Sequence, residues 1–351
     1  MYRRHRNMQG FTIIELLVVV AIIALLVAIL MPSLSQARKH AKTVQCGANL
    51  HHVGLAVSNY LFESGGVYPA SYYYPEDEFG SWSLRGQNNQ HPFGYIHWSF
   101  FMYASGKVGQ QAFQCPEYEN GGAPRTNPGP DPENWEGGQI DQNSQANPNQ
   151  LEDKQAPRMA YAANAVIMPR NKFTKTLSGG PRVNRFVQDG QITSPGNTVM
   201  VTEYLNNWQG LGVRDGGGVL SKAHRPINPF FHVGGGFDEY QAGVNNPGFI
   251  YGLPNDQKTY GLLDLKQVRA KVNILDASSG VAQINAVGRH HPSKDPLYAE
   301  RFGGSANFLY ADTHVDNTTV LDTIRKRHWG DAYYTITGEN KVLNMQTIDQ
   351  P

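Results

Sequence analysis

Four potential metal ligands occur close together near the C-terminal end, namely His290, His291, Asp312 and His314. Imidazole nitrogen and carboxylate oxygen are common ligands of transition metals, so these residues could bind one together. Their spacing does not match a compact motif such as His-Glu-x-x-His. We therefore expect loop residues near a hairpin, with a metal site as the alternative.

Other catalytic and cofactor-binding patterns are scarce. Oxygen ligands for calcium occur around one predicted turn, at Asp312, Asp316 and Asn317, but without the regularly spaced acidic residues of an EF-hand loop. We expect no cofactor, and calcium is the alternative. The sequence also lacks the Gly-x-Ser-x-Gly motif of serine hydrolases. We expect that the protein is not an enzyme.

The chain contains two cysteines, Cys46 and Cys115. In an oxidising compartment such a pair can form a disulfide, and a loop of this length would stabilise the fold by roughly 4 kcal/mol. Two unpaired buried thiols are the alternative. We expect the disulfide, because it would link the head of the protein to the helix that carries Cys46.

One carboxylate, Glu15, lies inside an apolar run that ends at Met31. A helix rises about 1.5 Å per residue, so this run spans roughly 30 Å, the thickness of the hydrocarbon core of a bilayer. An ionisable group inside such a segment is costly unless it is paired. The sequence therefore predicts a single transmembrane helix over 11–31, and we expect the partner of Glu15 to lie outside this chain.

The residues around Glu15 resemble the class III leader of type IV pilins and type II secretion pseudopilins. Three arginines precede the segment MQGFTIIELL. In that family, a membrane-embedded prepilin peptidase cuts after the glycine and methylates the new N-terminal residue. The resemblance implies a leader peptide over 1–10, cleavage between Gly10 and Phe11, and N-methylation of Phe11. It also implies that Glu15 pairs with the N-terminal amine of a neighbouring subunit.

Two simpler interpretations of the apolar run fit less well. A secretory signal peptide has a shorter apolar core and a small-x-small cleavage site after it. A plain signal anchor leaves Glu15 unexplained. Basic residues lie on both sides of the run, so the positive-inside rule does not set the orientation. The placement of the helix in the inner membrane, with a periplasmic or other extracytoplasmic head, rests on the resemblance.

After the apolar run, small and apolar residues recur at helical intervals, at Ala37, Ala41, Val44, Ala48 and Leu55. This pattern predicts an amphipathic helix extension over 32–64, which two consecutive glycines should end. The resemblance implies a pilin-like α+β fold. In this fold, one long N-terminal helix packs with its second half on an antiparallel β-sheet head.

The globular head is expected over 65–351. Charged residues make up only 17% of the chain, which also contains 37 glycines and 21 prolines, as in a loop-rich extracytoplasmic domain. The segments near 118–157 and 206–260 look like large loop insertions, and the first contains so few aliphatic residues that we expect it to bury little. Glycine runs in the second lack the lysine of a phosphate loop and predict turns. We expect strands over 197–203, 271–275 and 306–315.

Short motifs in the head resemble a large bacterial group of pseudopilin-like proteins that abounds in Planctomycetes and Verrucomicrobia. Members often carry a C-terminal His, nine further residues and then Asp-Gly. Here Phe302 occupies the histidine position and Thr313 the glycine position. Because a β-branched residue disfavours positive φ, we expect a different type of turn at Thr313. His290 and His291 lie upstream, across an apparent insertion, and are the candidates to replace the missing histidine.

The expected function is that of a structural subunit of a type II secretion or type IV pilus-like filament. Its expected partners are other pilin-like subunits, the prepilin peptidase, an inner-membrane assembly platform and the membrane. A net charge of +1 argues against a dedicated nucleic-acid binder. The alternative is a membrane-anchored extracytoplasmic binding module, for example for polysaccharide, in which tryptophans stack on sugars. These would be Trp82, Trp98, Trp135 and Trp208.

Overall fold

The computed structural model describes residues 12–76, 94–146, 148, 150–170, 185–232, 248–251, 262–270, 274, 283–335 and 341–342. By its contacts the chain divides into a unit that ends at Ala41 and a unit that begins at Lys42. Helix α1 (Ile13–Glu63) contributes its first part to one unit and its last part to the other. The two units are described separately below.

The first unit is the apolar part of α1. Its large apolar side chains are exposed along its whole length. The most apolar stretch has a mean hydropathy of 3.3, and α1 is the one helix in the described part of the chain that is long and apolar enough to cross a membrane. Because these side chains are not buried in the protein, lipid or neighbouring subunits are the surroundings that suit them.

In the second unit, the last part of α1 packs into the core of the head. Its buried residues recur at intervals of three or four and form one stripe, made of Cys46, Leu50, Val53, Gly54, Ala56 and Val57. Gly54 lies so close to Leu309 that an added Cβ would come within 2.7 Å of its Cδ1. The helix then ends at Gly65 and Gly66, which both have positive φ, and the N–H of Gly66 donates to the Leu61 carbonyl.

The apolar residues from which the helix extension was predicted are not the ones that α1 buries. Ala37, Ala41, Val44, Ala48 and Leu55 are all exposed. This part of α1 has two apolar stripes on opposite sides, and the buried one includes a cysteine and a glycine, which the hydrophobic pattern underweights. The predicted helix extension is confirmed.

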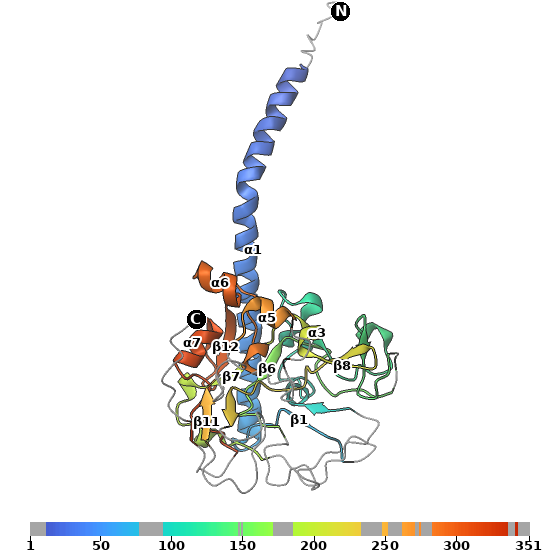
Figure 1. The fold of residues 1–351 in the computed structure, drawn as a ribbon, viewed down its shortest axis with the longest axis vertical. Coiled ribbons are helices and arrows are strands. Elements are labelled where there is room, and N and C mark those ends of the chain that lie inside the picture. Colours follow the sequence, from blue (N-terminus) through green and yellow to red (C-terminus); the bar gives the residue numbers. More distant parts are fainter. Residues whose placement is uncertain are drawn as a thin grey trace, which may run out of the picture. The chain divides into compact units, whose positions relative to one another are not determined.

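The core of the head is a four-stranded antiparallel sheet with the order β13-β12-β7-β6. Its strands are β6 (Tyr161–Ala163), β7 (Val199–Glu203), β12 (Ala306–Tyr310) and β13 (Val315–Thr318). β7 and β12 are buried at every position, and the last part of α1 lies along them (Figure 1). The expected α+β fold is confirmed. Two of the expected strands are present, although the segment 306–315 forms most of a hairpin rather than one strand. The expected strand over 271–275 lies outside the described residues, apart from Ile274, which is in a turn.

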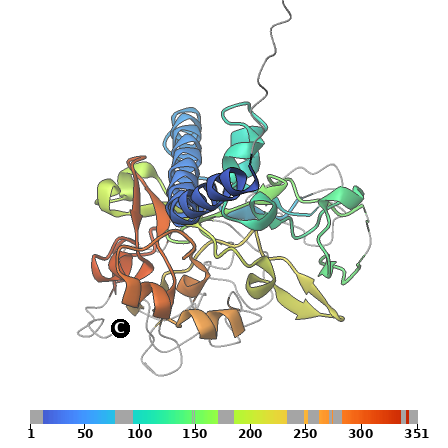
Figure 2. The same ribbon diagram turned by 90° about the horizontal axis from the view of Figure 1, so that it is seen from above.

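Short elements surround this sheet. The strands are β1 (Tyr72–Tyr73), β2 (Ile96–His97), β3 (Ala123–Pro124), β4 (Gln139–Ile140), β5 (Arg158–Met159), β8 (Val213–Asp215), β9 (Gly218–Leu220), β10 (Phe230–His232), β11 (Gly248–Tyr251) and β14 (Lys341–Val342). The α-helices are α2 (Trp98–Tyr103), α3 (Trp208–Leu211), α5 (Leu265–Ala270), α6 (Pro296–Phe302) and α7 (Val320–Arg325). The 3₁₀ helices are η1 (Gln110–Phe113), η2 (Glu119–Gly121), η3 (Pro132–Asn134), η4 (Asp189–Gln191), η5 (Pro195–Asn197) and η7 (Gln283–Ala286). Figure 2 shows α2 beside α1, where Phe101 contacts Tyr60.

The segment 118–157 buries far more than its composition predicts. Many of its buried residues are polar, and several of them are hydrogen-bonded to one another or to the backbone. The Asp153 carboxylate accepts from the backbone N–H groups of Tyr95 and Asn127, at 2.7 and 2.9 Å. Buried polar groups are tolerated when they are paired in this way. The expectation that this segment buries little is therefore wrong.

The described part of the second inserted segment contains the helix α3 and the short strands β8, β9, β10 and β11. Within 206–260, β8 and β9 form a hairpin whose two loop residues, Gly216 and Gly217, have φ values of 52° and 90°. A two-residue hairpin loop of this kind requires positive φ at both positions. The prediction of a turn at this glycine run is confirmed. The run at 234–236 lies outside the described residues.

Candidate functional site

Two of the predicted N-terminal site residues, Gly10 and Phe11, lie outside the described residues. Glu15 is described, and it lies in the first turn of α1. Its carboxylate accepts hydrogen bonds from the backbone N–H and the hydroxyl of Thr12, each at 2.9 Å, while the Glu15 N–H donates to the Thr12 hydroxyl at 3.3 Å. This is a capping box, in which Thr12 and Glu15 satisfy free backbone donors at the start of a helix.

The capping box changes the interpretation of Glu15. The countercharge of Glu15 was expected outside the chain, and within the chain Thr12 adds two hydrogen-bond donors. The motif Thr-x-x-Glu before an apolar run was the available signal. Thr12 carries no charge, so the negative charge of Glu15 still has no countercharge among the described residues of the first unit. Glu15 therefore combines a structural role at the helix start with a free negative charge.

A second group of chemically active residues is buried where β7 and β12 meet the head part of α1. Glu203, at the end of β7, is fully buried. Its Oε1 accepts from His291 Nε2 and from Asn307 Nδ2, and its Oε2 accepts from the Asn307 backbone N–H, each at 2.9 Å. His291 Nδ1 lies 3.2 Å from the Thr43 hydroxyl on α1. Both oxygens of the buried Glu203 carboxylate thus accept hydrogen bonds, from His291 and from Asn307.

These contacts set the ionisation of the cluster. Burial acts to raise the pKa of Glu203, but the hydrogen bond from His291, the two nearby imidazoles and the Asn307 N–H outweigh it and hold this pKa below its usual range. Burial lowers the pKa of His290 to about 4. The cluster therefore holds a negative carboxylate in the core, next to imidazole groups that remain in contact with it.

A disulfide lies against the same cluster. It joins Cys46 on α1 to Cys115 after η1, with Cα atoms 4.9 Å apart, and both cysteines are fully buried. His290 Nε2 lies 3.7 Å from Cys115 Sγ and 3.7 Å from Glu203 Oε2. The predicted disulfide is thus adjacent to a buried carboxylate that the sequence did not single out. Glu203 ends the strand sequence Val-Met-Val-Thr-Glu, and a carboxylate after three apolar strand residues was the available signal.

His291 lies at the entrance of β12, although thirteen residues separate it from Ser305. The two residues form an antiparallel bridge with N–H···O distances of 3.1 and 2.9 Å. The intervening segment, which includes α6, is therefore looped out. Gly304 makes this possible, since an added Cβ there would lie 1.6 Å from the His291 carbonyl oxygen. His291 therefore lies beside the start of β12, on the far side of this insertion. Phe302 does not take that position and is instead buried at the end of α6.

The other two predicted metal ligands lie in the hairpin that joins β12 to β13. Asp312 and His314 are exposed, and Asp312 Oδ1 lies 2.6 Å from His314 Nδ1. The His314 ring stacks on Tyr310, with centroids 4.2 Å apart. Since β12 separates this hairpin from His291, and a five-residue strand is roughly 17 Å long, the four candidates do not meet at one metal. They form two separate pairs.

The turn at Thr313 differs from the expected one. Thr313 has a φ of 76°, the left-handed conformation that was expected to be avoided. Its N–H donates to the Tyr310 carbonyl at 2.9 Å, and its own carbonyl lies 3.1 Å from His51 Nδ1 on α1. A three-residue hairpin loop requires a left-handed residue after the turn. The hairpin pairing therefore imposes on threonine a conformation that suits glycine, and the prediction of a different turn is wrong.

We expect Thr313→Gly to raise the free energy of unfolding by about 1 kcal/mol. The left-handed conformation costs an L-residue about 1–2 kcal/mol, and the greater freedom of glycine in the unfolded chain offsets part of the gain. Urea denaturation of the full chain in detergent micelles measures the change. Thr313→Ala keeps a Cβ and is the matched control. Equal stability of the glycine and alanine variants would contradict this account.

Comparisons with known proteins agree with the N-terminal features. Residues 5–31 match the prokaryotic N-terminal methylation motif. The N-terminal segment is type IV pilin-like. A stretch of 46 residues is 54% identical to the type IV wide pilus major component PilA4 of Thermus thermophilus, and covers 13% of this chain and 35% of that relative. The chain thus spans about a third of the relative's length. No solved structure matches it. The resemblance to the Planctomycetes group stays a prediction.

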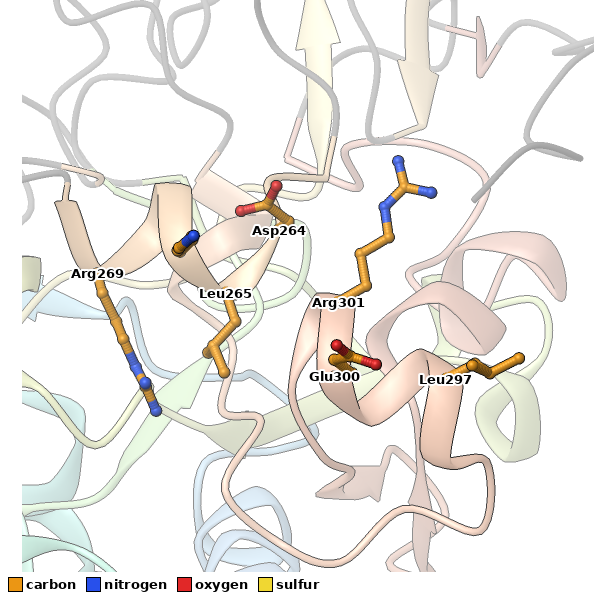
Figure 3. Close-up of a pocket in the computed structure, with 7 residues that line it drawn as sticks. Asp264, Leu265, Arg269, Leu297, Glu300 and Arg301 are labelled. Atoms are coloured by element: carbon orange, nitrogen blue, oxygen red, sulfur yellow. The ribbon is translucent and has the colours of Figure 1, made fainter.

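A surface cleft of about 470 Å³ lies between α5 and α6. Its lining includes three cationic residues, Lys266, Arg269 and Arg301, together with Asp264 and Glu300. Figure 3 shows that Arg269 and Arg301 point in different directions, so these two cations do not converge on one ligand. The mixed charges and the divergent side chains indicate a solvated surface rather than an anion-binding site.

The tryptophans proposed to bind sugars differ in their exposure. Trp98 is fully buried and packs edge-on against Phe113. Trp135 and Trp208 are half-buried, and the indole N–H of Trp135 donates to the Gly129 carbonyl at 3.0 Å. Trp82 lies outside the described residues. For Trp98, the expectation of an exposed stacking platform is wrong.

Proposed function

We propose that this protein is a structural subunit of a pilus-like filament, of the type IV pilus or type II secretion kind. Prepilin peptidase cleaves it after Gly10 and methylates Phe11, and an inner-membrane assembly platform then inserts it into the filament. Before assembly, α1 anchors it once in the inner membrane, with the head on the periplasmic side. The protein itself catalyses no reaction.

One observation carries this proposal: the methylation motif over 5–31 continues directly into an exposed apolar helix with Glu15 in its first turn. A plain anchor requires only the apolar length. A carboxylate there suits a subunit whose helix is transferred from lipid into a bundle of identical helices, where a countercharge is available. After cleavage, the countercharge is the Phe11 amine of a neighbouring subunit.

The head part of α1 also supports packing between subunits. Val44, Leu55 and Phe62 are 71%, 47% and 90% exposed. They are spaced by about three and about two helical turns, so they lie on one side of α1. This side is opposite the stripe buried in the head. Exposed large apolar side chains along one side of a helix indicate a contact surface, and the occupant that this proposal requires is another copy of the subunit.

We also propose that the Cys46–Cys115 disulfide ties α1 to the head in the mature subunit. Assembly pulls on α1 while the head must follow. Within the head, Cys115 lies beside the core strands, and the Tyr161 hydroxyl donates to the Cys46 carbonyl at 3.0 Å. The covalent link adds to these packing contacts.

Processing is the direct test of this function. We expect mass spectrometry of the membrane protein to find a chain that begins at N-methylated Phe11. Gly10→Ala should leave nearly all of the protein uncut, because the peptidase accepts glycine at this position, whereas Gln9→Ala should be cut normally. A wild-type chain that keeps Met1 in a host with an active prepilin peptidase would overturn the proposal.

A further inference from the structure

The disulfide and the buried carboxylate lie within one small volume. One potential ligand atom from each of Cys46, Cys115, Glu203 and His291 lies within 4.8 Å of all the others, and all four residues are buried. Two of these residues are sulfur donors, one is an imidazole and one is a carboxylate. Thiolate, imidazole and carboxylate are all ligands of zinc in proteins, and four of them match the tetrahedral coordination that zinc prefers.

We propose that these four residues bind one zinc ion when the Cys46–Cys115 disulfide is reduced. The ligands are the two thiolates, His291 Nε2 and one carboxylate oxygen of Glu203. The site is formed by α1, η1 with the residues after it, β7 and the strand entrance at His291. Zinc would therefore link the same parts of the head that the disulfide links.

Conversion of the disulfide form to the zinc-bound form requires a two-electron reductant, such as a thiol or a phosphine. Two electrons from the reductant break the S–S bond, and two protons convert the sulfurs to thiols. Zinc binding then releases these two protons, because the metal binds thiolates. The zinc ion stays divalent throughout. In the disulfide the sulfurs are bonded to each other, so metal binding requires them to separate to the span of a zinc site, with Zn–S bonds of about 2.3 Å.

The surrounding residues already hold the ligands in suitable orientations. His291 directs Nε2 toward the cluster and Nδ1 toward the Thr43 hydroxyl, at 3.2 Å. A hydrogen bond at the second nitrogen is the usual support of a zinc-bound histidine. Asn307 donates twice to Glu203 and also contacts the Thr43 carbonyl, at 3.1 Å. These residues fix the imidazole and the carboxylate independently of the disulfide.

His290 supplies a further contact to the negative charge of the site. Two thiolates and one carboxylate exceed the charge of zinc by one. His290 Nε2 is 3.7 Å from both Cys115 Sγ and Glu203 Oε2, and His290 Nδ1 is buried without a hydrogen-bond partner in the described part of the chain. An imidazole in this position can donate to a thiolate once the sulfurs have separated. The donor set favours zinc over calcium, which takes six to eight oxygen ligands.

Cobalt binding to the reduced protein tests the proposal. The full-length protein is purified in detergent micelles in its disulfide form, reduced with a phosphine, desalted without oxygen and titrated with Co²⁺. We expect one ion per chain, with sulfur-to-cobalt charge-transfer absorption and the visible bands of a tetrahedral site, which Zn²⁺ then removes. The unreduced protein should give neither signal.

Variants separate the proposed site from simple thiol binding. His291→Gln keeps both thiols and should weaken Co²⁺ binding at least tenfold and change the visible bands. His314→Gln removes an exposed histidine in the hairpin and should bind as wild type does. Reduced protein that keeps its circular dichroism but lacks charge-transfer absorption overturns the proposal, as does unchanged binding in His291→Gln.

If the protein loses its native circular dichroism on reduction, a second measurement decides. In that case the reduced chain is refolded with Zn²⁺ or with Mg²⁺. Recovery of the native circular dichroism with zinc alone supports the site, and equal recovery or equal failure with both ions overturns it. Neither result bears on processing at Gly10, so the test is independent of the proposed filament function.

Discussion

Replacing Glu15 with leucine should leave membrane insertion intact and abolish filament assembly. A charge in the span costs roughly 3 kcal/mol on insertion scales, so leucine should insert at least as well as the wild type. In the filament, the Phe11 amine of the neighbouring subunit would enter an apolar bundle without its countercharge. Leaving one member of a buried pair alone costs about 3–5 kcal/mol, a factor of at least about a hundred in the contact equilibrium. Shear fractionation, or cysteine cross-linking between subunits, measures the assembled fraction.

The capping box provides sharp controls for this prediction. Glu15→Gln keeps a side chain that can cap the helix but removes the charge, so it should fail to assemble as Glu15→Leu does. Thr12→Ala removes the hydroxyl that donates to the Glu15 carboxylate at 2.9 Å. It keeps the charge of Glu15, so this variant should assemble. The opposite result, with Glu15→Gln functional and Thr12→Ala defective, would assign Glu15 a purely structural role. Normal assembly of Glu15→Leu would overturn the proposed pairing.

Removing the disulfide should be the most destabilising change in the head. The bridge closes a loop between residues 69 positions apart, and the chain-entropy model gives about 4 kcal/mol for a loop of this length. The double variant Cys46→Ala and Cys115→Ala should lose this amount. Urea denaturation of the full chain in detergent micelles, with a chelator present to exclude metal binding, measures it. Reduced wild-type protein under the same conditions separates the bridge from the packing of the two side chains.

Peptide mapping without reductant checks the bridge itself. We expect a linked pair of peptides that contain Cys46 and Cys115. Full alkylation of both thiols in native protein that was never reduced would contradict the bridge. That outcome would leave the zinc proposal to be tested directly, since both thiols would then be available as ligands.

For residues 11–64, the sequence pattern predicted the helix but not its packing. The apolar length, Glu15 and the glycine pair after Glu63 predicted one long helix and its end, because helix formation and its termination depend on local residues. The sequence pattern did not indicate which face of this helix is buried. Both stripes of α1 are apolar, and a single helix carries no information about which one meets a sheet from distant parts of the chain. The close approach of Gly54 to Leu309 became visible only in the assembled head.

The cluster around Glu203 and the turn at Thr313 depended on tertiary structure. Cys46, Cys115, Glu203 and His291 come from four distant parts of the sequence, and no spacing rule relates them. Pairing of β7 with β12 and docking of α1 place their ligand atoms within 4.8 Å. Likewise, Thr313 has a positive φ of 76° because the hairpin pairing outweighs its local preference. The sequence by itself predicted the long apolar helix and the leader motif, since these follow from local composition and period, while the α+β class was implied by the resemblance to pilins. The tertiary structure decided the buried site, because burial and proximity are properties of the packed chain.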